Sequence, residues 1–159
     1  MNIFVLDEDK QIAVDALCDV HLTKMPLETV QILNTALHIN ELDDLAFYGR
    51  GYVNHPCCTW AAESWANWKW LYDYGCAIGD RFERERGKPH ASITKMSAFD
   101  LDAIKQSMPQ GGYTELPQCM PDDCKDDNVV TGYRNYYHTV KAKEDWFDKS
   151  TCVNTVWDR

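Results

Sequence analysis

Apolar residues along the chain recur mostly at helical spacing, and the longest such block spans residues 54–87. Pro56 suits the first turn of a helix, where its missing N–H costs nothing, and Gly87 is a natural stop. A single helix over this block would be ~48 Å long at a rise of ~1.5 Å per residue. That is long for a small domain, so we expect the helix to bend at Gly75 or Gly79.

The remaining apolar pattern predicts one short extended segment and several shorter helices. Residues 2–6 (NIFVL) form an apolar run ended by acidic residues, which is typical of a buried strand. Helical spacing recurs over residues 10–18 and 26–39, and Pro26 either starts the second helix or kinks one that continues from the first. Further helices are predicted at 98–107 and 128–146. The pattern therefore predicts a mostly α, single-domain fold over residues 1–159, with a long central helix and a short N-terminal strand or extended segment.

Composition narrows the class of protein. A chain of 159 residues is enough for one domain with a real core. No apolar run approaches the ~18 residues of a membrane span, so we expect no membrane partner and an intracellular location. The seven cysteines lack C-x-x-C spacing, which favours buried thiols and predicts no metal site and no cofactor.

The charge balance bears on the kind of ligand. The chain has 16 basic and 25 acidic residues, a net charge of −9. Proteins that bind duplex DNA over a broad surface rely on lysine and arginine to neutralise phosphates. Nucleic acid is therefore disfavoured as a partner, although a local basic pocket remains compatible with it. The balance favours a compact ligand held at a focused site.

Two residues of the tryptophan-rich block are candidates for ligand binding. Trp60 could stack on a base, an interaction worth ~1–3 kcal/mol. Asn67 interrupts an otherwise apolar face, and a core-facing amide needs a hydrogen-bonding partner. It either braces a neighbouring backbone or binds the hydrogen-bonding edge of a ligand, and the sequence leaves both interpretations open.

His21, Lys24 and Glu28 would share one face if their helix passes through Pro26. Such a trio offers an acid/base pair and a cation, with His21 and Glu28 as catalytic candidates; the alternative is a solvated ion pair. His55 stands just before a predicted helix start, where backbone N–H groups attract phosphate. It could equally serve as an ordinary capping residue.

Two cationic groups complete the candidates. Arg84, Lys88 and His90 belong to a dense basic run that could clamp a phosphate or be neutralised by interleaved glutamates. The last predicted helix carries a mixed aromatic and cationic set at Tyr133, Arg134, Tyr137, His138 and Lys141. This set suits a phosphorylated, ring-containing ligand, but tyrosines at such spacing also often pack in a core.

Several stretches resemble a family of small tailed-phage proteins: MNIFVLDED, NHPCCTWAAESWANWKWL, RGKPH and VVTGYRNYYHTVKAKEDWF. That resemblance covers nearly the whole chain and implies no particular activity. More distantly, the chain has a short N-terminal segment, an early helix with His then Glu, a long aromatic central helix and a tyrosine-rich C-terminal end. This layout is similar to that of the phage pyrimidine-dimer DNA glycosylase family. In that family an N-terminal amine attacks the sugar and a glutamate assists, which the resemblance places at Glu28. The bulky Asn2 should preserve Met1, unlike the processed threonine terminus of that family.

Three functions follow as hypotheses. The first is a phage protein of the host cytoplasm that binds a small nucleotide or modified nucleotide between aromatic and cationic side chains. Such a protein could sequester or cleave a host signalling nucleotide as an anti-defence factor. The second is a base-excision enzyme similar to the glycosylase family, and the third is an inhibitor that binds a host protein. Exposed tryptophans would additionally favour a homo-oligomer.

Overall fold

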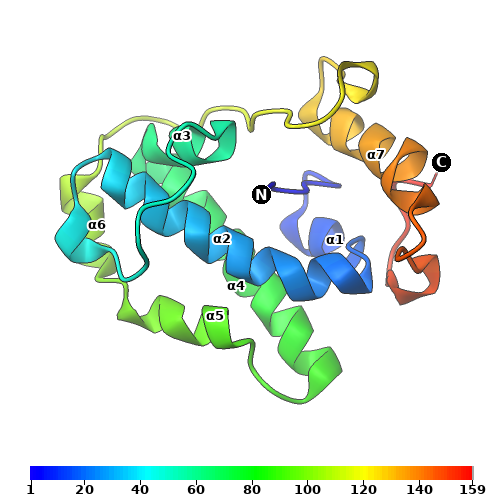
Figure 1. Cartoon of the computed structure of the whole chain (residues 1–159), viewed down its shortest axis with the longest axis horizontal. Helices are drawn as coiled ribbons and strands as arrows, with labels where there is room; N and C mark the ends of the chain where they lie inside the picture. Colours follow the sequence, from blue (N-terminus) through cyan, green and yellow to red (C-terminus); the bar gives the residue numbers. More distant parts are fainter. Residues whose placement is uncertain (159) are drawn as a thin grey trace.

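The computed structural model describes residues 1–158, which form a helical fold (Figure 1). The helices are α1 (Lys10–Asp15), α2 (Asp19–Ile39), α3 (Pro56–Ala62), α4 (Trp65–Arg86), α5 (Ala91–Lys95), α6 (Leu101–Ser107) and α7 (Val129–Thr139). The mostly α prediction is confirmed, but residues 2–6 form no strand, and no other strand occurs within residues 1–158. None of the helices in this range is long and apolar enough to cross a lipid bilayer.

Helices α2 and α4 cross at the centre of the molecule, with α5 alongside them (Figure 1). Glycine allows α4 to approach both neighbours closely. A Cβ atom at Gly75 would lie 2.8 Å from Cγ2 of Thr29 in α2, and one at Gly79 would lie 2.7 Å from Cγ2 of Ile93 in α5. The two glycines thus serve close packing rather than a bend.

The expected bend lies elsewhere, so the prediction of a kink at a glycine was wrong. The block divides at Ser64, whose side chain accepts the Asn67 N–H at 3.1 Å and caps α4. Serine in this role satisfies a helix N–H that has no partner in the helix itself. The predicted stop is correct, because Gly87 ends α4 with a left-handed φ of 69°. The last helix is shorter than predicted and ends at Thr139.

The N-terminal segment lies between α7 and the crossing of α2 and α4 (Figure 1). Its residues 3–6 are buried. The Tyr74 hydroxyl of α4 donates to the Phe4 carbonyl at 2.6 Å, and Arg134 Nε of α7 donates to the Leu6 carbonyl at 2.7 Å. These bonds give the segment the backbone partners that a sheet would otherwise provide.

Candidate functional site

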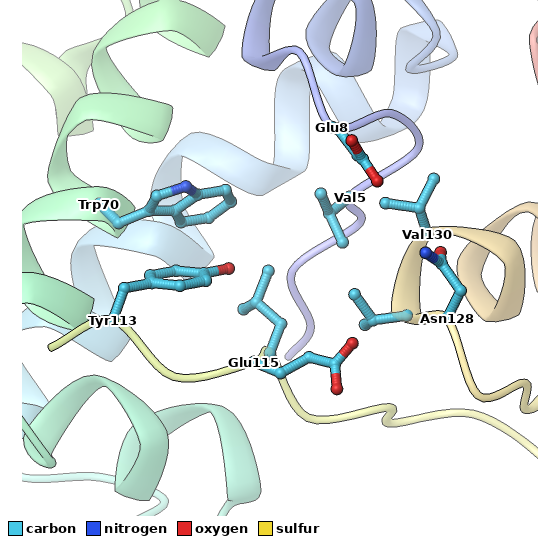
Figure 2. Close-up of a pocket in the computed structure, with 9 residues that line it drawn as sticks. Val5, Glu8, Trp70, Tyr113, Glu115, Asn128 and Val130 are labelled. Atoms are coloured by element: carbon cyan, nitrogen blue, oxygen red, sulfur yellow. The ribbon is translucent and has the colours of Figure 1, made fainter.

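Two of the cavities are lined in part by residues 1–6 of the N-terminal segment. The larger one, about 510 Å³, is mostly apolar. Figure 2 shows the Trp70 and Tyr113 rings on one side of it, opposite the start of α7. Among the described residues, the charged groups that line it are the carboxylates of Glu8 and Glu115. This cavity suits an apolar or aromatic group far better than a phosphate.

The smaller of the two cavities, about 220 Å³, is lined by more titratable side chains than the larger one. We call it the N-terminal pocket. It is lined by Met1, Asn2, Phe4, His21, Lys24, Met25, Glu28, His55, Cys119, Tyr136 and Lys141. Chemistry that moves protons or forms bonds needs groups of this kind. We therefore place the candidate site here, although the other cavity is larger.

A buried carboxylate lies at the centre of the N-terminal pocket. Glu28 is only 8 % exposed. Its Oε2 lies 3.6 Å from the α-amino nitrogen of Met1 and accepts the Asn2 N–H at 3.1 Å. Its Oε1 lies 3.2 Å from Nζ of the exposed Lys24. The carboxylate is thus held between two primary amines.

Helix α2 brings His21 to the same pocket, because the helix continues through Pro26. The imidazole stacks on Phe4 with ring centroids 4.3 Å apart, and its Nδ1 is hydrogen-bonded to the Tyr137 hydroxyl. Burial, reinforced by the charge of Lys141, lowers the pKa of His21 to about 3. The ring is therefore neutral at pH 7 and can act as a hydrogen-bonding group, not as a cation.

His55 caps α3 by accepting the Cys57 N–H on Nδ1 at 3.1 Å, and it also lines the N-terminal pocket. Burial and the charge of the Met1 ammonium lower the pKa of His55. Lys141 reaches the pocket from the residues that follow α7, and its Nζ lies 4.9 Å from the centre of the Tyr136 ring. Both predicted roles of His55, capping and access to a ligand, are therefore compatible with its position.

Asn67 and Trp60 brace the backbone. Asn67 is fully buried and donates to the Trp60 carbonyl at 2.9 Å and to the Thr114 hydroxyl at 2.8 Å. The indole of Trp60 donates to the Thr114 carbonyl at 3.0 Å. Both side chains thus fasten the irregular loop after α6 to α3 and α4, and neither lines the N-terminal pocket.

The basic run does not reach the pocket either. Arg84 lies 3.8 Å from Asp15, Lys88 is exposed, and His90 caps α5 by accepting the Ser92 N–H. Arg84 is thus next to Asp15 and not to one of the interleaved glutamates, and His90 serves as a helix cap.

The aromatic and cationic set of α7 separates in space. Tyr133 and Tyr137 are fully buried. Arg134 and His138 line a different small cavity beside Trp157. The structure therefore does not bring Asn67, Arg134 and His138 together. Of the residues predicted for the site, His21, Lys24, Glu28, His55 and Lys141 share the N-terminal pocket.

The sequence patterns missed the N-terminal residues themselves. Asn2 is held on both sides: its Nδ2 donates to the Cys119 carbonyl at 2.9 Å, and its Oδ1 accepts the Tyr133 hydroxyl at 2.8 Å. A helical period carries no information about such contacts, which join residues more than 100 positions apart. The resemblance in layout was the signal that could have directed attention to Met1.

A model of a family described as pyrimidine dimer DNA glycosylase matches residues 1–97. No curated protein and no solved structure matches the chain. Within the matched residues lie five members of the pocket that carry charge or titrate: Met1, His21, Lys24, Glu28 and His55. The rest of the pocket includes three residues from the later part of the chain, Cys119, Tyr136 and Lys141.

Proposed function

The chain belongs to the pyrimidine dimer DNA glycosylase family, and on that premise we propose that it excises a damaged base from DNA. In this proposal the α-amine of Met1 is the nucleophile and Glu28 assists it. The observation that carries the proposal is the 3.6 Å separation between the Met1 nitrogen and a carboxylate oxygen that is almost buried.

The two groups are suited to this reaction. The neutral amine would attack C1′ of the deoxyribose, forming an N–C1′ bond while the bond to the base breaks and the base leaves with its electron pair. Glu28 is placed to accept the proton that the amine loses. The resulting carboxylic acid can return that proton to O4′ as the sugar ring opens to an imine. Holding the acid and the nucleophile together removes the entropic cost of assembling them during the reaction.

The N-terminal segment supports this arrangement because it is fixed from several elements. Tyr74 and Arg134 bind its carbonyl groups, and Tyr133 binds the side chain of Asn2. The nitrogen of Asn2 contacts the same Glu28 oxygen, so an amine on either of the first two residues would adjoin the acid. Lys24 and Lys141 line the pocket and can neutralise phosphates.

Reductive trapping tests the proposal. The protein is incubated with duplex DNA that carries a cyclobutane pyrimidine dimer or an abasic site, with borohydride to reduce any imine. We expect a stable protein–DNA adduct, and peptide mass mapping should locate it on the N-terminal residue. Undamaged duplex is the control. The absence of an adduct on both damaged duplexes, together with an intact glycosidic bond at the dimer, would overturn the proposal.

Two variants separate the groups around the carboxylate. Lys24→Arg keeps the positive charge but removes the competing primary amine, so trapping should persist if the α-amine reacts. Glu28→Gln keeps the size of the side chain and should slow trapping by ~10²–10⁴-fold, the usual contribution of a positioned acid or base. If Lys24→Arg abolished trapping, Lys24 and not the α-amine of Met1 would be the nucleophile, and the proposed role of Met1 would be wrong.

Binding of a small nucleotide is a second candidate, supported by the paired Trp70 and Tyr113 rings of the larger cavity. A base could lie against these rings, although Glu8 and Glu115 would repel a phosphate nearby. Calorimetry against a panel of nucleotides and cyclic nucleotides tests this candidate. If no nucleotide in the panel gave a heat of binding, nucleotide binding would be eliminated, and with it the sequestration of a host signalling nucleotide.

A further inference from the structure

Three metal-binding side chains meet at the edge of the N-terminal pocket. They are His55, Cys57 and Cys119, and their ligand atoms all lie within 4.8 Å of one another. The lack of C-x-x-C spacing predicted no metal site, and Cys119 lies 62 positions after Cys57. Only the fold brings the irregular loop after α6 against the start of α3.

We propose that His55, Cys57 and Cys119 bind a zinc ion. This inference does not rest on the proposed glycosylase activity.

The separation of the two sulfur atoms fits a shared metal. Cys57 Sγ and Cys119 Sγ are 3.7 Å apart. Two Zn–S bonds of ~2.3 Å that meet at a tetrahedral angle place their sulfurs about 3.8 Å apart. A disulfide would require ~2.05 Å, so both chain segments would have to move closer to form one. The cysteines are already at the spacing that zinc needs.

The histidine is oriented for the same centre. Its Nδ1 faces the first turn of α3, where it accepts the Cys57 N–H at 3.1 Å. The Met1 backbone forms a hydrogen bond with the same ring. Histidines that bind metals commonly use one ring nitrogen for the metal and donate the other to a backbone carbonyl. Zinc would replace the Cys57 N–H as the partner of Nδ1.

The surroundings favour a soft divalent cation over a harder one. Cys57 is fully buried, and Cys119 and His55 are partly buried, so the donors lie mostly out of water. Two thiolates would balance the charge of one Zn²⁺, and thiolate and imidazole donors select zinc over magnesium or calcium. Three protein ligands leave a fourth position open, where a water molecule can complete a tetrahedron.

The loop that carries Cys119 is held in place independently. The Cys119 carbonyl accepts a hydrogen bond from the Asn2 side chain, and the Cys119 backbone nitrogen lies 3.5 Å from the Tyr133 hydroxyl. A metal at this position would join the start of α3 to the loop after α6, and Asn2 already binds that loop through the Cys119 carbonyl. The ion would act as a clamp beside the α-amine.

Metal analysis of the full chain tests the proposal. The protein is expressed in zinc-supplemented medium, purified with reductant and measured by inductively coupled plasma mass spectrometry. We expect close to one zinc ion per chain. Replacement by Co²⁺ should produce thiolate-to-cobalt charge-transfer absorption and the intense visible bands of tetrahedral cobalt.

Variants assign the ligands. Cys57→Ser, Cys119→Ser and His55→Asn should each lower the bound zinc more than tenfold, and asparagine preserves the helix cap. Cys76→Ser is the matched control, because Cys76 is a partly buried cysteine outside the cluster and its loss should leave the zinc content unchanged. If Cys57→Ser fails to fold, the two variants at partly buried positions still decide the question.

Three results would overturn the proposal: no zinc with no cobalt spectrum, equal zinc in the ligand variants and the control, or a Cys57–Cys119 disulfide in a metal-free protein. None of these measurements involves DNA, so their failure is distinct from failure of the trapping experiment.

Discussion

Arg81 provides the sharpest test of the packing that supports the pocket. It is fully buried in α4 and donates to three carbonyl oxygens: Val14 at 2.6 Å, Leu17 at 2.8 Å and Thr151 at 2.9 Å. It thereby joins α4 to the end of α1 and to the C-terminal tail. In the sequence, Arg81 stands just before Arg84 at the start of the basic run, where a solvated position is the usual expectation for arginine.

The expected cost of Arg81→Met follows from these bonds. Methionine fills similar space but donates nothing. The Val14 carbonyl also receives the Leu17 N–H, so the main loss falls on the carbonyls of Leu17 and Thr151. An unsatisfied buried acceptor costs about 1–3 kcal/mol, and the Leu17 carbonyl is buried whereas the Thr151 carbonyl is partly accessible to water. We therefore expect a loss of about 1–3 kcal/mol in the free energy of unfolding.

Urea denaturation followed by circular dichroism measures this loss. Arg84→Met is the control, because Arg84 is 60 % exposed and lies 3.8 Å from a carboxylate. Its effect should stay within about 0.5 kcal/mol. If both variants changed stability equally, with unchanged denaturant dependence, the role assigned to Arg81 would be refuted.

Three further predictions concern single positions. The pKa of His21 is lowered to about 3 by burial and neighbouring lysines. As the pH falls, His21 is therefore protonated in the unfolded chain at a higher pH than in the folded protein. The contribution of neutral His21 to the free energy of unfolding should be fully present above pH ~6.5, and the free energy of unfolding should fall by about 2 kcal/mol between pH 7 and pH 5. Urea titrations at both pH values should show a smaller fall for His21→Gln. Gly79→Ala should destabilise the protein by about 1–3 kcal/mol despite the better helix propensity of alanine, because the new Cβ meets Ile93; an added Ile93→Ala should recover part of the loss in thermal denaturation. Asn67→Asp should lower the stability by about 1–3 kcal/mol by removing the donor to the Thr114 hydroxyl, and an unchanged melting temperature would contradict the bracing role.

Helical periodicity predicted the fold class well because most of the core lies on helix faces. It could not locate the break in the central block. The glycines at 75 and 79 look like weak points in a helix, yet contacts with α2 and α5 explain their presence. Ser64 was visible in the sequence as a polar interruption, and its capping role depends on a turn that periodicity does not detect.

The site was predictable only in part, for a related reason. Residues on α2 fall on one face by their spacing, so His21, Lys24 and Glu28 could be grouped from the sequence. Asn67 and Arg134 could not be placed, because their partners belong to a loop and to the N-terminal segment. Short polar residues and an α-amine carry no periodic signal.

The attachment of the first residues to α7 and to the late loop has a consequence for protein synthesis. Residues 2 and 6 leave the ribosome well before their partners at 119, 133 and 134 are made. At ~5–20 residues per second, those partners follow on the order of 10 seconds later. During this interval the N-terminal segment is exposed to the enzymes that trim or modify nascent chains. The chemical identity of the group beside Glu28 is therefore settled before folding can protect it.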